Sequence, residues 1–362
     1  MVAAAAGAKQ STTSWALPQI RTVVAHGLMA SSVGSFKPNA HLTRTELNEL
    51  VPALPTDAVV WSDSGDDPTT DSTTTTGSTT TTTTTSGSPP GSPRSGASVT
   101  VSAFDTALVS QLGLSKAATR FRLAARQAGL SPPKRFGTET VARLLGLRIN
   151  HPASQDTLEL LPSSPITRAE TAYSIAQVLT FTGEETQWVE DTSHELSLPT
   201  LSGWQKRILN YAVSFIGYPY IWGGTSPVTQ TLFGRTVPGG FDCSGFVWRV
   251  YKLHTYSGGK QLSSTIRGRT TYVMSGEVGR SKRISFGALE PGDVLFFGSK
   301  GTRSKPGQIY HTAIYLGGGW LIQSSGNGVD LAPLEGWYQS HFAWARRPLA
   351  EAGLENVYAV TG

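Results

Sequence analysis

The segment from Ser62 to Ser98 places the strongest limit on how this chain can fold. It consists mainly of Thr, Ser, Gly, Pro and Asp, and it contains no apolar side chain before Ala97. A segment of this kind buries too little apolar surface to offset the conformational entropy lost on ordering. We therefore expect residues 62–98 to be a disordered linker, which divides the 362 residues into at least two folded parts.

Short helical units are predicted on both sides of this linker. Thr43 and Glu46 form an S/T-x-x-E capping box before an apolar run, and the same box recurs at residues 167–170. A weaker middle copy is predicted within residues 125–145. Repeated units that each join two helices through a loop are expected to pack against one another.

The single cysteine of the chain, Cys243, lies at the start of a predicted helix. Glycines and Asp242 precede it, and apolar residues follow at helical spacing as far as Leu253. A thiol at a helix start meets unpaired backbone N–H groups and the positive end of the helix dipole, which favour the nucleophilic thiolate. The alternative is a small buried hydrophobic side chain, the usual role of a free cysteine. With one cysteine, no disulfide can form within the chain.

A second apolar segment supplies a candidate base for this thiol. Two apolar runs flank the glycines at 317–319, which predicts a β-hairpin. With a three-residue loop, Ala313 lies opposite Gln323, so His311 and Gln323 lie diagonally on one face, within reach of each other. A two-residue loop would place them on opposite faces. A cysteine, a histidine and a polar residue that orients the imidazole supply a nucleophile, a base and an orienting group.

Four motifs in this part of the chain occur in the order of a known family. They resemble the motifs of the NlpC/P60 cysteine peptidases, which cut peptidoglycan stem peptides, and the resemblance covers about residues 204–348. The motifs are Tyr-Ile-Trp-Gly-Gly (220–224), Asp-Cys-Ser-Gly (242–245), Leu-Glu-Pro-Gly-Asp-Val-Leu-Phe-Phe (289–297) and His-Thr-Ala-Ile-Tyr-Leu-Gly (311–317).

The resemblance implies an α+β, papain-like fold in which a helix bearing the cysteine packs on an antiparallel sheet. It also implies a thioester mechanism without cofactor or metal, acting on the bond between D-glutamate and diaminopimelate or lysine. The implied catalytic residues are Cys243, His311 and Gln323, and the implied substrate-binding residues are Tyr220, Asp242 and Ser244.

Several of these roles have structural alternatives. Asp242 can cap the helix as well as bind substrate, and Tyr220 can simply pack under the glycine turn. Ser324 and Asn327 are rivals of Gln323 for the orienting role.

The sequence departs from the family in two places. Many members have an Arg, a Ser two residues later and a Gln further on; here Arg267 matches the first, while Arg269 and Tyr272 occupy the other places. An extra segment at residues 228–237 predicts a small hairpin at the rim of the cleft. This hairpin or the N-terminal modules could cover the cleft and keep an enzyme latent.

The N-terminal units resemble S-layer homology modules, which bind cell-wall polysaccharide, through Phe-x-Pro (36–38) and Thr-Arg-x-Glu (43–46 and 167–170). Positive charge is concentrated elsewhere: residues 1–200 hold 14 Lys and Arg against 17 Asp and Glu, and residues 201–362 hold 16 against 8. The cations are scattered rather than massed on one helix, so we favour an anionic bacterial wall over nucleic acid as the partner. An ordinary solvated surface stays open.

We therefore expect a secreted, wall-associated peptidoglycan endopeptidase. No run is apolar for long enough to span a membrane, and residues 2–6 are too short and uncharged for a whole export signal, so the leader is expected to be absent from this sequence. The alternatives are an amidase or acyl transferase on the same fold, or a non-catalytic wall-binding protein. The expected organisation is an S-layer-homology-like module (1–61), the linker (62–98), a further helical region (99–185), a connector (186–201), the catalytic domain (202–350) and a tail (351–362).

Overall fold

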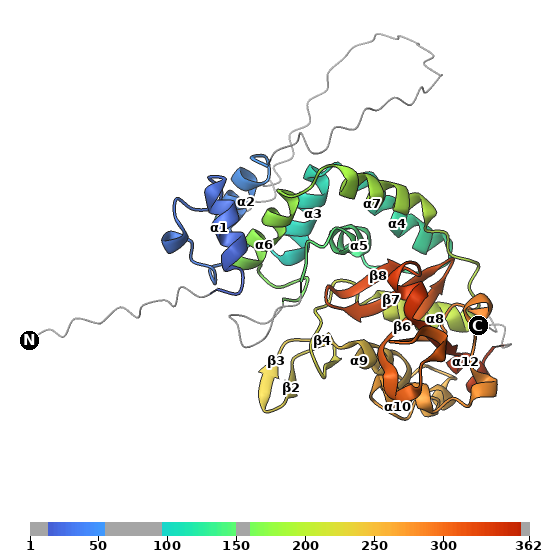
Figure 1. Ribbon diagram of the computed structural model, residues 1–362. Coiled ribbons are helices and arrows are strands. Elements are labelled where there is room, and N and C mark those ends of the chain that lie inside the picture. The colour runs from blue at the N-terminus through green and yellow to red at the C-terminus, as the bar shows by residue number, and fades with distance from the viewer. Residues whose placement is uncertain (1–13, 55–95, 150–159, 356–362) are drawn as a thin grey trace, which may run out of the picture.

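The computed structural model describes residues 14–54, 96–149 and 160–355, and residues 62–95 of the predicted linker and 356–362 of the tail lie outside the described residues. The described chain has a helical part followed by a part that mixes helices and strands (Figure 1). The helices of the first part are α1 (Leu17–Ala25), α2 (Arg44–Leu50), α3 (Val101–Gln111), α4 (Ser115–Gln127), α5 (Phe136–Leu144), α6 (Arg168–Val178) and α7 (Glu184–Glu195).

Three short extended segments join the helical part into one unit. The backbone N–H of Leu42 donates to the carbonyl of Ile166 (3.0 Å), that of Ile166 to Val99 (2.8 Å), and that of Val99 to Leu42 (2.9 Å). These bonds close a ring of three segments from distant parts of the sequence, and all three side chains are fully buried. The next residue in each segment is a threonine whose side chain caps a helix: Thr43 for α2, Thr100 for α3 and Thr167 for α6.

This ring corrects the predicted position of the middle copy. The segment that matches the two capping boxes is at Val99 and Thr100, whereas α5, over part of the predicted range 125–145, begins after Arg135 without a side-chain cap. The Thr100 hydroxyl accepts from the N–H of Ala103, so the position that holds glutamate in the other two copies holds alanine here. Half of the box is missing, which is why the sequence pattern did not identify this copy.

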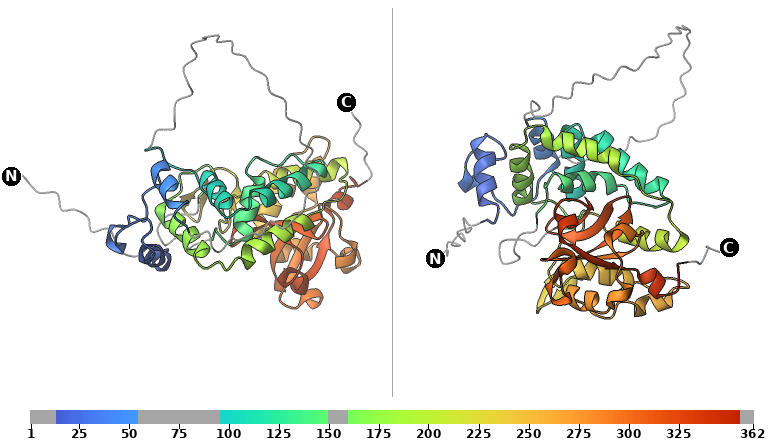
Figure 2. Two further views of the ribbon diagram at one scale, coloured as in Figure 1. Left: turned by 90° about the horizontal axis from the view of Figure 1, so that it is seen from above. Right: turned by 45° about the vertical axis from the view of Figure 1, so that its right-hand side comes forward.

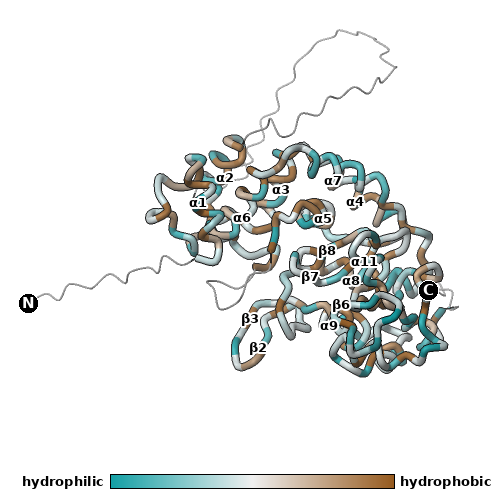
Figure 3. Tube along the Cα trace, viewed as in Figure 1, coloured by the Kyte–Doolittle hydropathy of each residue, from teal (hydrophilic) through white to brown (hydrophobic). Residues whose placement is uncertain are grey.

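Helices α4, α5 and α7 connect this ring to the second part of the chain. Helix α7 covers most of the predicted connector 186–201 and packs against α4. Figure 3 shows hydrophilic residues along α4 and α7 and hydrophobic residues on α5, which lies between them and the sheet.

No helix in the described ranges is long and apolar enough to cross a membrane.

The second part contains a five-stranded antiparallel sheet with the strand order β8-β7-β6-β5-β9. Strand β5 is buried along its whole length. The sheet consists of β5 (Val294–Gly298), β6 (Ile309–Gly317), β7 (Trp320–Ser325), β8 (Gly328–Pro333) and β9 (Phe342–Arg346). The helices around it are α8 (Gly203–Val213), α9 (Cys243–Trp248), α10 (Thr271–Gly276), α11 (Trp337–His341) and α12 (Pro348–Glu351).

The hairpin β6–β7 has the predicted register but a different loop. Ile314 pairs with Ile322, which places Ala313 opposite Gln323, as expected for a three-residue loop. The ladder then shifts at Leu316 and closes with Gly317 opposite Trp320. The two remaining residues, Gly318 and Gly319, have φ of +60° and +81°, a combination that favours glycine at both positions of a tight turn. The bulge therefore compensates for the shorter loop and keeps His311 and Gln323 on one face.

Helix α5 attaches the helical part to the sheet. Arg143 on α5 donates to the carbonyl of Gly217 (2.7 Å) and to the carbonyl of Asn327, in the turn between β7 and β8. Phe121 of α4 packs edge-on against Trp320 of β7, with ring centroids 5.8 Å apart. Figure 2 shows the helical part lying as a layer along one side of the mixed part.

Candidate active site

Cys243 is the first residue of α9, as the sequence predicted. Asp242 is the N-cap, and its Oδ1 accepts from the backbone N–H of Gly245 at 2.6 Å. A side chain at position 245 would collide with the carbonyl oxygen of Gly224, 1.9 Å from an added Cβ, so the close approach of this turn requires glycine. Helix α9 packs against β6 and β7, which confirms the expected arrangement of a cysteine-bearing helix on an antiparallel sheet.

The thiol of Cys243 does not have the lowered pKa that its place at a helix start predicted. Burial, with the neighbouring Asp242 carboxylate, raises its pKa to about 12. The backbone N–H groups of Ser244 and Thr312 and the Arg269 guanidinium act in the opposite direction but do not outweigh burial. The thiol is therefore protonated at neutral pH and needs a base to become a nucleophile. The proximity of Thr312 places the thiol beside the strand that carries His311.

His311 and Gln323 form the predicted pair across β6 and β7. The distance from His311 Nε2 to Gln323 Oε1 is 2.6 Å. An amide oxygen can only accept, so Nε2 carries the proton and Nδ1 keeps its lone pair. Burial lowers the pKa of His311, and the hydrogen bond to Gln323 partly offsets this effect. The imidazole is accordingly neutral at neutral pH, the form that can take a proton.

Two residues that sequence reasoning missed lie behind Gln323. Its Nε2 donates to the hydroxyl of Tyr338 on α11. Asp330 lies directly opposite Gln323 on β8, is 5 % exposed, and accepts from Ser325 Oγ at 3.0 Å. Burial raises the pKa of Asp330 to about 7, while Ser325, Arg143 and the Gln323 amide lower it. The sequence signal that could have identified Asp330 is its position as the one charged residue in the apolar run that forms β8.

Arg269 is a third residue of the site whose contacts sequence reasoning did not predict. Its guanidinium pairs with both carboxylate oxygens of Asp242, at 3.0 and 2.9 Å, and donates to Ser244 Oγ at 2.6 Å. Oδ2 of Asp242 also accepts from the backbone N–H of Gly223. Asp242 and Ser244 are therefore beside the thiol as predicted, but their polar atoms already have partners within the protein.

The remaining candidates divide into those near the thiol and those away from it. Tyr220 is near: burial raises its pKa, and Cys243 is the neighbour with the next largest effect. Ser324 donates instead to the carbonyl of Phe241, and Asn327 lies in the β7–β8 turn, where its carbonyl accepts from Arg143. The structure thus brings Gln323, and neither rival, to the imidazole.

The extra segment before α9 forms the predicted hairpin. Its strands are β2 (Gln230–Leu232) and β3 (Arg235–Val237), and β1 (Thr225–Ser226) pairs with β4 (Gly240–Phe241) beside it. Phe233 at the tip is 80 % exposed and Trp222 is 73 % exposed, so this rim presents two large aromatic side chains to solvent. The hairpin projects from the edge of the mixed part in Figure 1.

The site offers the parts of a nucleophilic acyl transfer. A thiol, a neutral imidazole and an amide that fixes the imidazole come from α9, β6 and β7, respectively. In the described ranges, no group of three or more His, Cys, Asp or Glu side chains is placed to hold a metal ion.

Two family models match this chain in separate regions. The NlpC/P60 family matches residues 217–347, and the S-layer homology domain matches residues 8–47. The first match contains Cys243, His311 and Gln323, and the second contains the capping box at Thr43.

Curated relatives match the same C-terminal region. The chain is 27% identical over 152 residues to a gamma-D-glutamyl-L-lysine dipeptidyl-peptidase of Bacillus subtilis, covering 41% of this chain and 43% of the relative. It is 33% identical over 145 residues to the murein DD-endopeptidase MepH of Escherichia coli, covering 39% and 45%. The chain thus spans less than half of the length of these relatives.

Among solved structures, the NlpC/p60 domain of the peptidoglycan hydrolase SagA is 30% identical. The match covers 39% of this chain and 97% of that domain, with a TM-score of 0.28.

Proposed function

Because residues 217–347 form an NlpC/P60 domain, we propose that this protein is a cysteine endopeptidase that cuts the stem peptides of peptidoglycan. The observation that carries the proposal is the contact between His311 Nε2 and Gln323 Oε1, on strands that also bring Thr312 beside the thiol of Cys243. We propose the bond between D-glutamate and diaminopimelate or lysine as the one that is cut. No observation favours an amidase, an acyl transferase or a non-catalytic scaffold over this activity.

In the proposed reaction, His311 and Cys243 act together. His311 Nδ1 takes the thiol proton as the sulfur attacks the amide carbonyl carbon and forms a C–S bond. The backbone N–H of Cys243 donates to the developing oxyanion. The C–N bond then breaks, and the imidazolium returns its proton to the leaving amine. Water, deprotonated by His311, attacks the thioester, which releases the carboxylic acid and restores the thiol.

The ion pair between Asp242 and Arg269 favours a substrate without a free amino end. A dipeptidyl-peptidase must recognise the terminal ammonium of its substrate, and a carboxylate beside the nucleophile is the natural acceptor. Arg269 already neutralises Asp242 here, at 2.9 Å. An added ammonium would have to displace this guanidinium and would lose a charge-assisted pair. We therefore propose that the enzyme cuts within stem peptides that are still attached to the wall.

We expect the enzyme to cut stem peptides with free and acetylated amino ends at rates within about threefold of each other, because Asp242 is neutralised. Arg269→Ala frees this carboxylate and should favour the free amine by about tenfold, the effect of about one charge-assisted hydrogen bond. The measurement is kcat/KM on matched soluble peptides, with the products identified by mass spectrometry. Lys260→Ala, an exposed substitution, is the matched control.

Three results would count against these proposals. Products that end at a residue other than D-glutamate would refute the bond assignment. A strong preference of the unmodified enzyme for the free amine would refute the endopeptidase assignment. Failure to cut any stem peptide, with folding intact, would refute the peptidase.

The pH dependence of kcat/KM should follow the neutral state of both groups. His311 acts as a base only when unprotonated, so its lowered pKa moves the acid limb below the ordinary histidine value of 6.5. The thiol stays protonated up to about pH 12, so no rise from thiolate formation is expected between neutral pH and about pH 9. Asp330, with a pKa of about 7, lies behind Gln323. Measuring the same pH profile with Asp330→Asn separates the titration of Asp330 from that of His311. An acid limb above pH 7 in that variant would contradict the role of His311 as the base. A steady rise of kcat/KM at alkaline pH would contradict the protonated thiol.

We also propose that the N-terminal modules hold the enzyme on an anionic wall polysaccharide outside the cell. The match to the S-layer homology domain at residues 8–47 supports this attachment. The proposed division of labour assigns wall binding to residues 1–61 and 99–185, which the predicted linker 62–98 separates in sequence, and chemistry to residues 202–350. Residues 186–201 and 351–362 are the proposed connector and tail.

A further inference from the structure

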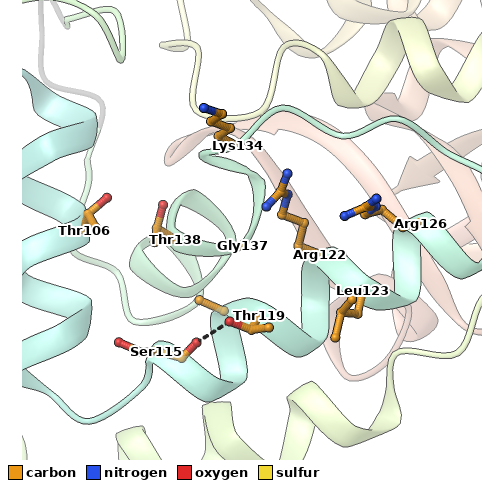
Figure 4. Close-up of a pocket in the computed structure, with 10 residues that line it drawn as sticks. Thr106, Ser115, Thr119, Arg122, Leu123, Arg126, Lys134, Gly137 and Thr138 are labelled. Atoms are coloured by element: carbon orange, nitrogen blue, oxygen red, sulfur yellow. Dashed lines mark hydrogen bonds between the residues drawn. The ribbon is translucent and has the colours of Figure 1, made fainter. Parts of the chain in front are cut away.

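A basic pocket lies in the helical part, away from the candidate active site. It has a volume of about 250 Å³ and lies where α3, α4 and the start of α5 meet. Figure 4 shows Arg122 and Arg126 one turn apart on α4, with their guanidinium groups on the side of that helix where Lys134 lies. Among the described residues, the rest of the lining is hydroxyl-bearing, small or apolar, with no acidic and no aromatic side chain: Thr106, Ser115, Ala118, Thr119, Leu123, Gly137 and Thr138.

Three cations of this pocket have no carboxylate partner among the described residues, unlike three of the arginines around them. Residues 101–150 contain eight Lys and Arg but only two acidic residues. Three of the arginines pair with carboxylates, and Arg135 donates to the carbonyls of Ser214 and Ile216. Three of the other four cations line the pocket, and none of them has a carboxylate partner among the described residues. The paired arginines are Arg120 with Glu190, Arg143 with Glu139, and Arg148 with Asp105 and Glu170.

Arg122 gives a second, independent indication of a missing ligand. Its Nε is buried and has no hydrogen-bond partner among the described residues. Like charges four residues apart on a helix also repel, as Arg122 and Arg126 do. A buried donor without a partner and a concentration of positive charge are both relieved by a bound anion.

A second hollow extends this surface. It has a volume of about 600 Å³, shares Thr106, Lys134 and Thr138 with the first, and adds Arg135. Its other polar side chains are the hydroxyls of Thr100, Ser102 and Ser163. The two hollows together form a continuous cationic, hydroxyl-lined track, which suits a chain with repeated anionic groups better than a single small ion.

We propose that this track binds the phosphate groups of a phosphodiester-linked polyol or sugar polymer. Arginine presents a planar fork of donors that matches phosphate oxygens in pairs, and the hydroxyls suit a polyol or sugar backbone. Among the described residues, no aromatic side chain lines either hollow to stack on a nucleobase, the contact that single-stranded nucleic acid binding uses. The identity of the polymer rests on the proposed location at the wall, whereas the anion site is independent of the proposed peptidase. Both hollows lie outside the two family matches at residues 8–47 and 217–347.

The test is direct binding of a fluorescently labelled poly(glycerol phosphate) chain to the full-length protein. The combined variant Arg122→Gln, Arg126→Gln and Lys134→Gln should bind at least about tenfold more weakly, because each lost charge-assisted contact removes part of the affinity. The affinity of the unmodified protein should fall with rising salt, and this dependence should be shallower in the variant. The matched control removes three exposed cations elsewhere, Lys260, Arg280 and Lys282.

The control should bind within about threefold of the unmodified protein, since it loses the same net charge away from the track. An unchanged melting temperature and unchanged cleavage of soluble stem peptides would show that the pocket variant is folded. The site is refuted if the pocket variant binds the polymer as well as the unmodified protein does, or if the unmodified protein does not bind it. If the protein binds single-stranded DNA of the same charge with equal affinity, the track binds polyanions in general and is not specific for the wall polymer. If inorganic phosphate displaces the polymer at an equal concentration of phosphate groups, the site binds a single ion and not a polymer.

Discussion

Cys243→Ala is expected to lower kcat for stem-peptide cleavage by at least about 10⁴-fold, and to about the level reached when His311 is also removed. The thiol is the atom that forms the covalent bond in the proposed reaction, and alanine offers no substitute. His311 cannot compensate, because in the proposed reaction it acts as a base and does not itself attack the carbonyl carbon. The measurement is fragment release from purified peptidoglycan, followed by mass spectrometry.

The effects of replacing Cys243 and His311 should not add. Cys243→Ala, His311→Ala and the double variant should show about the same residual activity, because nucleophile and base act as one unit. The melting temperatures of the variants are measured beside the activities, to confirm that each variant is folded. Residual activity within about tenfold of the unmodified enzyme in Cys243→Ala would exclude the thiol as nucleophile.

Gln323→Leu is expected to lower kcat/KM by about 10²–10³-fold while the protein stays folded. Leucine has a similar volume but cannot accept from His311 Nε2–H, so the imidazole loses the contact that fixes its tautomer and orientation. The effect should be smaller than that of replacing a triad aspartate, because an amide carries no charge to stabilise imidazolium. The loss should appear mainly in kcat, since the imidazole acts in the transition state.

Asn327→Ala is the matched control for this prediction. Asn327 is four residues from Gln323 and was a rival for the orienting role, but it lies in the β7–β8 turn and offers Arg143 its backbone carbonyl, which alanine retains. Its activity should stay within about threefold of the unmodified enzyme. If Asn327→Ala loses as much activity as Gln323→Leu does, or if Gln323→Leu is as active as the unmodified enzyme, the orienting role of Gln323 is refuted.

The features predicted correctly from the sequence depend on residues that are close together in the chain. The helix start at Cys243 followed from Asp242, the glycines and the apolar spacing. The strands on either side of the glycines at 317–319 followed from the two apolar runs and the glycines between them, and the register that brings His311 to Gln323 is that of the three-residue alternative. Such features are local because the periods of helices and strands repeat within a few residues.

The errors came from neighbours that are distant in the chain. The helix terminus alone predicted a lowered thiol pKa, but burial in the folded protein raises it to about 12. The middle capping segment was misplaced because the ring bonds of Leu42, Val99 and Ile166 join parts of the chain that no local pattern relates.

The sequence by itself therefore determined which chemical groups this protein has and in which local elements they stand. Only the tertiary structure decided how those groups are paired and buried. It places Asp330 and Tyr338 behind Gln323, pairs Arg269 with Asp242, and leaves three cationic side chains around one pocket without a carboxylate partner among the described residues. The physical reason is that secondary structure depends on repeats along the chain, whereas desolvation and charge pairing depend on distances through space.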